Sequence, residues 1–329
     1  MCAVRYGVLK RRIAAAVAVT ALLLTGACSW TDDKPDTVGG LTTVGLGVIP
    51  IVDVAPAYLG KAKGFFSSRG IDLSLVQEQG GAAIVKGVLA GKYQFGFSNV
   101  TSLMAAQADG APLRVVANGV ASTGREFRDF SAVVVPYGSP VRSAKDLAGK
   151  RISVNTLKNL GDTTVRQSVR KAGGDPTGIR FVAMPFSAMP NALQAGTVDA
   201  AWVVEPALSE AITLGAQVVA SNLVDTAPDL TVATYFTGPA PAGQDATLAK
   251  RFAEAVNESL RYAEEHPDEV RAVVGTYTKI TETVRLMMIL PEWPNAINRA
   301  SVERLAVLGE ADGMFTRPPV LDQLLPSAG

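Results

Sequence analysis

Short apolar runs with the alternation of β-strands recur along the chain, and most of them are followed by runs with helical spacing. Residues 71–76 read Ile-Asp-Leu-Ser-Leu-Val, the alternation of a half-buried strand. One helix face is predicted by apolar residues at spacings of four and three: Leu248, Phe252, Val256, Leu260 and Ala263. Strands that alternate with helices predict an α/β fold with parallel-dominated sheets and helices on both faces.

The same pattern gives the order of the elements. The predicted strands are 42–47, 71–76, 93–97, 113–117, 131–135, 151–155, 179–183, 198–204 and 217–220. The predicted helices between them are 56–63, 82–90, 143–148, 162–172, 187–195 and 206–214. From about residue 246 the chain is mostly helical, with further helices at 270–277, 281–290 and 301–308. A turn cluster at 136–140 separates two stretches of this rhythm, which favours two domains at this length.

The N-terminus has the features of a secretory signal peptide. Residues 13–24 form an apolar run, which is too short for a membrane-spanning helix of about 20 residues. Four basic residues precede the run, and the first acidic residue is Asp32. A basic start, a short apolar stretch and small residues at a cleavage site predict a signal peptide over residues 1–27.

Cys28 follows Thr25-Gly-Ala27 directly, which is similar to the lipobox of bacterial lipoproteins. The usual leucine three positions before the cysteine is Thr25 here. In proteins with this signal the cysteine becomes the lipidated first residue, so we expect a lipid anchor at Cys28 and a polar tether over 28–40. The protein is then expected outside the cytoplasm, on the cell membrane. An ordinary secreted protein with a cysteine at this position is the alternative.

The composition argues against several classes of function. The whole chain carries a net charge of +1, and loss of the basic signal segment lowers this to −3, so nothing indicates binding to nucleic acid. Hydrophobic residues make up 48% and charged residues 19%, as in a well-buried globular protein. A single histidine, His266, and the absence of a free thiol once Cys28 is acylated argue against a zinc or copper site. We expect no metal and no cofactor.

Several segments resemble a known family when they are taken in order. They are 55–66 (Ala-Pro-Ala-Tyr-Leu-Gly-Lys-Ala-Lys-Gly-Phe-Phe), 70–73, 89–98, 143–154 and 196–206. Together they resemble the substrate-binding proteins of ABC importers for nitrate, sulfonates and taurine, whose relatives take up pyrimidine precursors of thiamine. The resemblance covers nearly all of residues 41–240.

This resemblance implies a two-lobed periplasmic-binding-protein fold of type II, with a hinge of two crossing strands. Lobe one is expected over 41–133 plus 236–329, and lobe two over 136–232. The crossings are expected near 133–136 and 231–236. The ligand is expected in the cleft between the lobes, beyond the carboxyl ends of the strands, where helix N-termini offer free N–H groups.

The candidate ligand-binding residues lie at these strand ends and helix starts, or are aromatic residues near the expected cleft. They are Asp53, Tyr58, Gly80, Gly81, Ser98, Asn99, Thr101, Asn155, Thr163, Thr164, Trp202, Glu205 and Tyr235. Helix capping is the alternative for the polar residues, and core packing for the aromatic ones. In many relatives the tryptophan immediately precedes the Glu-Pro pair, but here Val204 has that place and Trp202 lies two residues earlier.

The resemblance therefore implies a monomeric solute-binding lipoprotein that delivers a small organic or anionic solute to an ABC permease and its ATPase. A sulfonate, a carboxylate, nitrate and a pyrimidine-like compound all remain open, since the expected cleft has no clear arginine pair. A surface sensor is one alternative. An enzyme of the same fold, such as a pyrimidine synthase or a menaquinone-pathway lyase, is another. The chain lacks the cysteine-rich segment of the synthases and shows no nucleophile with a supporting base, so we expect no catalytic residues.

Overall fold

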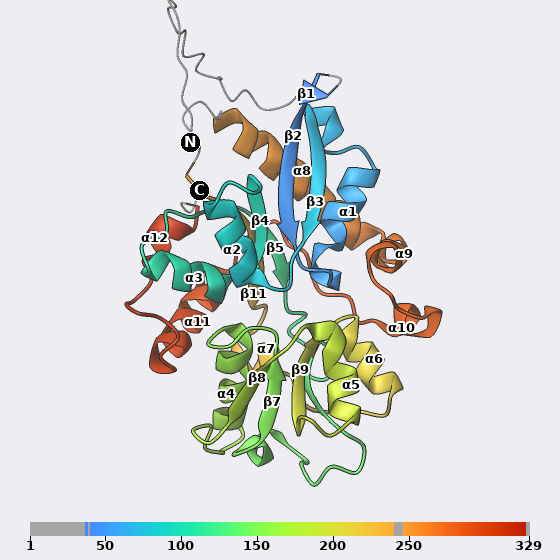
Figure 1. Cartoon of the computed structure of the whole chain (residues 1–329), viewed down its shortest axis with the longest axis vertical. Helices are drawn as coiled ribbons and strands as arrows, with labels where there is room; N and C mark the ends of the chain where they lie inside the picture. The colour runs from blue at the N-terminus through green and yellow to red at the C-terminus, as the bar shows by residue number, and fades with distance from the viewer. Residues whose placement is uncertain (1–36, 39, 240–245, 327–329) are drawn as a thin grey trace, which may run out of the picture. The chain divides into compact units, whose positions relative to one another are not determined.

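The computed structural model describes residues 37–38, 40–239 and 246–326, which form two β-sheets with surrounding helices (Figure 1). The predicted signal peptide and Cys28 lie outside the described residues. In the predicted tether, the described strand β1 (Thr37–Val38) pairs antiparallel with the start of β2 (Leu41–Val48), so this part of the segment belongs to a sheet edge. None of the helices in the described part of the chain combines the length and the hydropathy that crossing a membrane requires.

The first sheet combines strands from both halves of the chain. Its order is β1-β2-β4-β11-β5, and β3 pairs with β2. The remaining bounds are β3 (Ile71–Gln77), β4 (Phe95–Asn99), β5 (Arg114–Ala121) and β11 (Thr231–Thr237). Strand β2 runs parallel to β3 and β4, whereas β11 runs antiparallel to β4 and β5.

The second sheet is built from the middle of the chain, in the order β10-β6-β9-β7-β8. Its strands are β6 (Ser131–Val135), β7 (Arg151–Val154), β8 (Arg180–Ala183), β9 (Ala200–Val204) and β10 (Gln217–Ala220). Strand β7 is parallel to β8 and β9, whereas β6 is antiparallel to β9 and β10.

The α/β class is confirmed, but the sheets are mixed rather than parallel-dominated. The antiparallel pairings centre on β6 and β11. Each of these strands is the first that the chain enters after it passes from one sheet to the other. A parallel pairing needs a crossover between strands of one sheet, and these two strands are reached without one.

The passages between the sheets lie beside the predicted crossings. Residues 122–130 connect β5 to β6, and the residues that follow helix α7 (Asn222–Thr226) connect the second sheet to β11. The predicted crossings at 133–136 and 231–236 fall largely within β6 and β11, which are full members of their sheets. The alternation pattern predicted the strand at 131–135, and the family resemblance implied the one at 231–236. Neither showed which sheet each strand joins.

Helices follow most of the strands, as the sequence pattern predicts. Those before β11 are α1 (Ala55–Ala62), α2 (Gly81–Leu89), α3 (Val100–Ala108), α4 (Leu160–Lys171), α5 (Met189–Gln194), α6 (Ala207–Thr213) and α7, with short 3-10 turns at Val52–Val54, Ser67–Arg69, Ala144–Leu147 and Phe186–Ala188. The C-terminal helices are α8 (Ala246–Glu265), α9 (Pro267–Tyr277), α10 (Glu282–Met287), α11 (Arg299–Ala311) and α12 (Leu321–Leu324). Helix α8 packs on α1 and β5, and α11 packs on both α3 and α4.

One contiguous apolar core includes residues of both sheets. The five apolar positions predicted to form one face of α8 are all buried in it. Phe252 on this face stacks on Phe95 of β4 with their ring centroids 3.8 Å apart. The amphipathic spacing of α8 therefore fixes the C-terminal helices against the first sheet.

Replacing Phe252 with Ala should lower the free energy of unfolding by about 3–5 kcal/mol, because it leaves a cavity beside Phe95. Urea unfolding of the two proteins measures the difference. Phe127→Ala is the matched control, since the Phe127 side chain is 63% exposed and its loss should change stability by no more than about 0.5 kcal/mol. Equal losses in the two variants would contradict the packing described for α8.

Candidate functional site

A small cavity of about 20 Å³ lies where the carboxyl ends of strands from the two sheets meet. From the first sheet it is lined by the segment that follows β2, the end of β4 and the start of β11. From the second sheet it is lined by the end of β7, the start of α4, the turn before α5, and β9. Its lining residues are Ile49, Ile51, Asp53, Phe97, Asn99, Asn155, Leu160, Phe186, Trp202, Val204, Val232 and Ala233.

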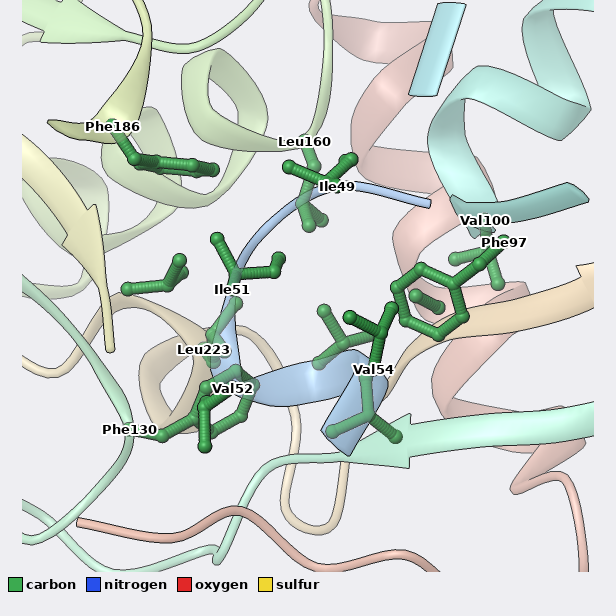
Figure 2. Packing of buried hydrophobic residues seen from close by; sticks show 14 of the residues in the cluster. Ile49, Ile51, Val52, Val54, Phe97, Val100, Phe130, Leu160, Phe186 and Leu223 are labelled. Carbon is green, nitrogen blue, oxygen red and sulfur yellow. The ribbon is translucent and has the colours of Figure 1, made fainter. Parts of the chain in front are cut away.

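Most of this wall is apolar. Ile49 and Ile51 come from the segment after β2, and Phe97 comes from β4 (Figure 2). Leu160 and Phe186 enter from the second-sheet part of the chain (Figure 2). The Trp202 ring meets Phe186 edge to face, with ring centroids 5.2 Å apart. Three aromatic rings and several branched side chains thus surround the few polar groups of the cavity.

The segment Ile49–Asp53 is held by three distant parts of the chain. Tyr277 Oη donates a hydrogen bond to the Ile51 carbonyl at 2.9 Å, and the Trp293 indole N–H donates to the Asp53 carbonyl at 3.1 Å. The Val52 N–H donates to the Glu205 carbonyl at the end of β9 at 3.0 Å. These bonds fix the backbone that carries Asp53.

Asp53 is 3% exposed, and its Oδ1 has no hydrogen-bond partner among the described residues. Burial raises the pKa of Asp53 to about 7, and the negative charge of Asp129 adds to this rise. Asp129 itself accepts hydrogen bonds from Ser122, Thr123 and Phe130. Of the two carboxyl groups, Asp53 is therefore the one with an oxygen left to bind something else.

Two amides share the cavity with Asp53. Asn99 Oδ1 caps helix α3 by accepting the Ser102 N–H at 2.9 Å. Asn155 Oδ1 is buried and has no partner among the described residues. At the site, Asn99 therefore has a structural role as a cap, and Asn155 offers a free acceptor.

The glycines predicted at the start of α2 lie against this polar end of the site. A Cβ at Gly81 would overlap Ser98 Oγ, and a Cβ at Gly80 would lie 2.9 Å from Thr156 Oγ1. Gly80 follows the first sheet's β3 and Thr156 follows the second sheet's β7, so the Gly80 backbone lies close to a side chain from the other sheet's part of the chain. Side chains at either position would push the facing segments apart.

Two side chains near the cavity connect segments that are distant in the sequence. Asn159 Nδ2, before α4, donates to Ser102 Oγ on α3 at 2.9 Å. Glu205 Oε1 accepts the Ile289 N–H at 3.0 Å, and both Glu205 oxygens are bound by Ser209. Burial raises the pKa of Glu205 to about 7. Glu205 therefore has its partners within the protein and does not line the cavity.

The other predicted residues have structural partners or lie behind the wall. Trp202 lines the cavity, but its indole N–H donates to Ser131 Oγ at 2.8 Å. Thr164 Oγ1 donates to the Leu160 carbonyl and accepts from Asn222, each at 2.8 Å. Tyr58 stacks on Tyr277, with ring centroids 4.0 Å apart, outside the lining.

Three further candidates carry buried hydroxyls without partners among the described residues: Thr101, Thr163 and Tyr235. None of them lines the cavity. The Tyr235 ring packs edge to face on Phe97 at 5.1 Å, and burial together with the nearby Asp53 charge raises the pKa of its hydroxyl. Tyr235 therefore lies behind Phe97 and does not line the cavity itself.

Most of the lining was absent from the sequence candidates. The missed residues are Ile49, Ile51, Phe97, Leu160, Phe186, Val204, Val232 and Ala233. The only available signal was that several lie in, or directly after, apolar strand-like runs. Apolar residues at strand ends are indistinguishable in sequence from core residues, whereas polar residues at the same place attract attention.

A larger hollow of about 850 Å³ lies elsewhere, beside Phe95, Leu113, Leu248 and Arg317. Phe95 begins β4, so this hollow lies at the amino end of that strand. Ligands of open α/β sheets bind beyond the carboxyl ends instead. Within the described ranges, no three His, Cys, Asp or Glu residues are grouped to hold a metal ion.

We expect the free energy of unfolding to fall as the pH rises from about 4.5 to about 7. Burial raises the pKa of Glu205 from 4.5 to about 7, so in this window the folded state binds more protons than the unfolded state. A rising pH then favours unfolding. Burial also raises the pKa of Asp53 to about 7 and that of Asp162 to about 6, and both act in the same direction.

Thermal unfolding between about pH 5 and about pH 8 measures this slope. Glu205→Gln should make it shallower, because the amide cannot titrate but still offers an oxygen to Ile289 N–H. Glu265→Gln, at an exposed position of α8, is the control that should leave it unchanged. An unaltered slope in Glu205→Gln would show that Glu205 is ionised in the folded protein throughout.

Solved structures with the same fold cover most of this chain. The alkanesulfonate-binding protein SsuA from Xanthomonas axonopodis pv. citri, bound to MOPS, matches with a TM-score of 0.72 at 17% identity, over 87% of this chain and 98% of that one. The periplasmic nitrate-binding protein NrtA from Synechocystis PCC 6803 matches with a TM-score of 0.69 at 13% identity, over 87% and 86%. The desulfurization enzyme DSZB matches with 0.63 at 16% identity, over 85% and 95%.

Identities this low establish a shared fold and leave the ligand open. A comparison with curated protein sequences finds no match. The family model described as NMT1/THI5 like matches residues 51–270, more than half of the chain and most of the cavity wall. The family resemblance seen in the sequence is thereby confirmed. The chain belongs to the NMT1/THI5-like family and has a periplasmic-binding-protein fold, which it shares with the alkanesulfonate-binding protein SsuA and the nitrate-binding protein NrtA.

Proposed function

We propose that this chain is an extracytoplasmic solute-binding lipoprotein that delivers a small molecule to an ABC permease and its ATPase. The cavity between the strand ends of the two sheets carries the proposal. There, Asp53 Oδ1 and Asn155 Oδ1 are buried without a partner among the described residues. Buried acceptors without partners are costly, and a solute that donates to them would remove that cost.

The size of the cavity supports a binding cycle that includes opening. A volume of about 20 Å³ has room for about one water molecule, far less than an organic solute needs. The solute would enter when the two sheets move apart about the passages at 122–130 and 227–230. Contacts such as the one between Asn159 and Ser102 would break on opening and form again on closing. Hinged closure around a small ligand is a common motion of two-lobed proteins.

The composition of the wall favours binding over catalysis. The residues described around the cavity include no Ser, Cys, His or Lys, so the Asp53 carboxyl has no nucleophile beside it in the wall to activate. The fold alone does not decide, since the desulfurization enzyme DSZB shares it. A carboxyl group, amides and aromatic rings can orient a solute without changing it.

Four of the sequence candidates are proposed to contact the solute: Asp53, Asn99, Asn155 and Trp202, which all line the cavity. Gly80, Gly81 and Ser98 are proposed to shape its polar end through their close packing. Thr101, Thr163, Thr164, Glu205, Tyr58 and Tyr235 are proposed to support the wall rather than to touch the solute. The lipid on Cys28 would keep the protein near its permease.

A screen of small metabolites by thermal unfolding tests the binding function. A true solute at a hundred times its dissociation constant should stabilise the wild type by about 2.7 kcal/mol. Asn155→Ala should reduce this gain at equal solute concentration, because it removes a polar group of the cavity. Asn191→Ala, at an exposed position of α5, is the matched control and should keep the full gain. The binding function is refuted when no compound stabilises the wild type.

Labelled palmitate should be incorporated into the full chain when it is expressed in a bacterial host, and the product should sediment with membranes. Cys28→Ala should abolish the label, because the acylated thiol is lost. Cys2→Ala is the control, since Cys2 belongs to the segment that is removed. Label that persists in Cys28→Ala would exclude the proposed anchor.

A further inference from the structure

The buried carboxyl group of Asp53 indicates which kind of solute can bind in the cavity. An ionised carboxylate can only accept hydrogen bonds, and Asp53 Oδ1 accepts none from a described residue. Its position is fixed, because Trp293 holds the Asp53 carbonyl and Tyr277 holds that of Ile51. The side chain is 3% exposed, so its free oxygen lies within the protein. A group that binds the ionised carboxylate must bring a hydrogen-bond donor.

The charge around Asp53 excludes the opposite kind of solute. No Arg, Lys or His is among the residues described in the cavity wall. The charged neighbour of Asp53 is Asp129, which is also acidic. An inorganic or sulfonate anion would therefore lie beside acidic groups, with no basic side chain in the wall to bind it. A protonated amine or amidine would instead bind the Asp53 carboxylate, and hydrogen bonds between a cation and a carboxylate are stronger than those between neutral groups.

The apolar residues of the wall indicate what the rest of the solute is like. Phe97, Phe186 and Trp202 supply aromatic surface, and Ile49, Ile51 and Leu160 supply branched apolar surface. Such a wall binds a compact apolar or flat ring, and aromatic faces also attract cations. A fully polar solute such as a free amino acid would leave most of its groups unpaired.

We propose that the solute is a small, mainly apolar organic molecule with a hydrogen-bond-donating nitrogen, and that Asp53 binds this nitrogen while sulfonates and nitrate are rejected. The inference rests on the proposed binding function and narrows its ligand class. It separates this chain from fold neighbours that are named for binding alkanesulfonate and nitrate.

The test compares matched compounds on the wild-type protein. One arm contains benzylamine, benzamidine and 4-aminopyrimidine together with a panel of metabolite amines. The other contains benzoate, benzenesulfonate, metabolite sulfonates and nitrate. Stabilisation in thermal unfolding should come from the first arm. Hits from the second arm alone would overturn the ligand class and keep the binding function, whereas no hit in either arm would refute the binding function itself.

Asp53→Asn should weaken binding of each amine hit about 10- to 100-fold, as expected for loss of a charge-assisted hydrogen bond. Asp72→Asn is the control, since Asp72 is an exposed acid on β3. Calorimetric titration measures both. Equal affinities in Asp53→Asn and wild type would overturn the role of Asp53.

A second measurement needs no variant and so does not depend on how Asp53→Asn folds. Affinity for a permanently protonated amine should rise with pH up to about 7, because binding requires ionised Asp53. The other titratable groups facing Asp53 are Asp129, Tyr235 and Tyr277, and burial raises the pKa of both tyrosines. Affinity that falls with rising pH would mean that Asp53 binds as the neutral acid, which contradicts the proposal.

Discussion

The backbone bonds that hold Ile49–Asp53 are the constraint on which the site depends. The segment leaves β2 of the first sheet, yet its Val52 N–H is bound by the Glu205 carbonyl of the second. Tyr277 and Trp293 bind its carbonyls from the C-terminal part of the chain. Three remote stretches of sequence therefore meet at one short segment. With its backbone fixed by these bonds, Asp53 can remain buried with an oxygen unpaired.

The cavity balances two opposing demands. Its mostly apolar wall lowers the local dielectric constant, which strengthens polar contacts made inside. The same low dielectric constant makes an unpaired oxygen costly, and Asp53 and Asn155 each have one. The buried carboxyl groups of Asp129 and Glu205, which do not line the cavity, are paired with several donors instead. Unpaired acceptors that line a cavity between the two sheets are the feature expected of a ligand-binding site.

The sequence was sufficient for most of the elements, because those depend on local periodicity, but it did not predict β1, α7 or α12. The apolar face of α8 and the alternation of 71–76 both appear where predicted. The sheet type was mispredicted because strand direction depends on which sheet the chain has just left. Strands β6 and β11 look like any other strand in sequence, yet both are antiparallel to their neighbours.

The sequence by itself determined the α/β class, the family and the polar groups at strand ends, because capping residues and hydrophobic periodicity are local signals. It placed Asp53, Asn99, Asn155 and Trp202 among the candidates that line the cavity. Only the tertiary structure decided that Glu205 and Thr164 are occupied by partners within the protein, and that Phe97, Leu160 and Phe186 form the wall. Some of these partners are local, since Ser209 lies four positions from Glu205. Others are remote, since Ile289 lies 84 positions from Glu205 and Asn222 lies 58 positions from Thr164, and no local pattern encodes those contacts.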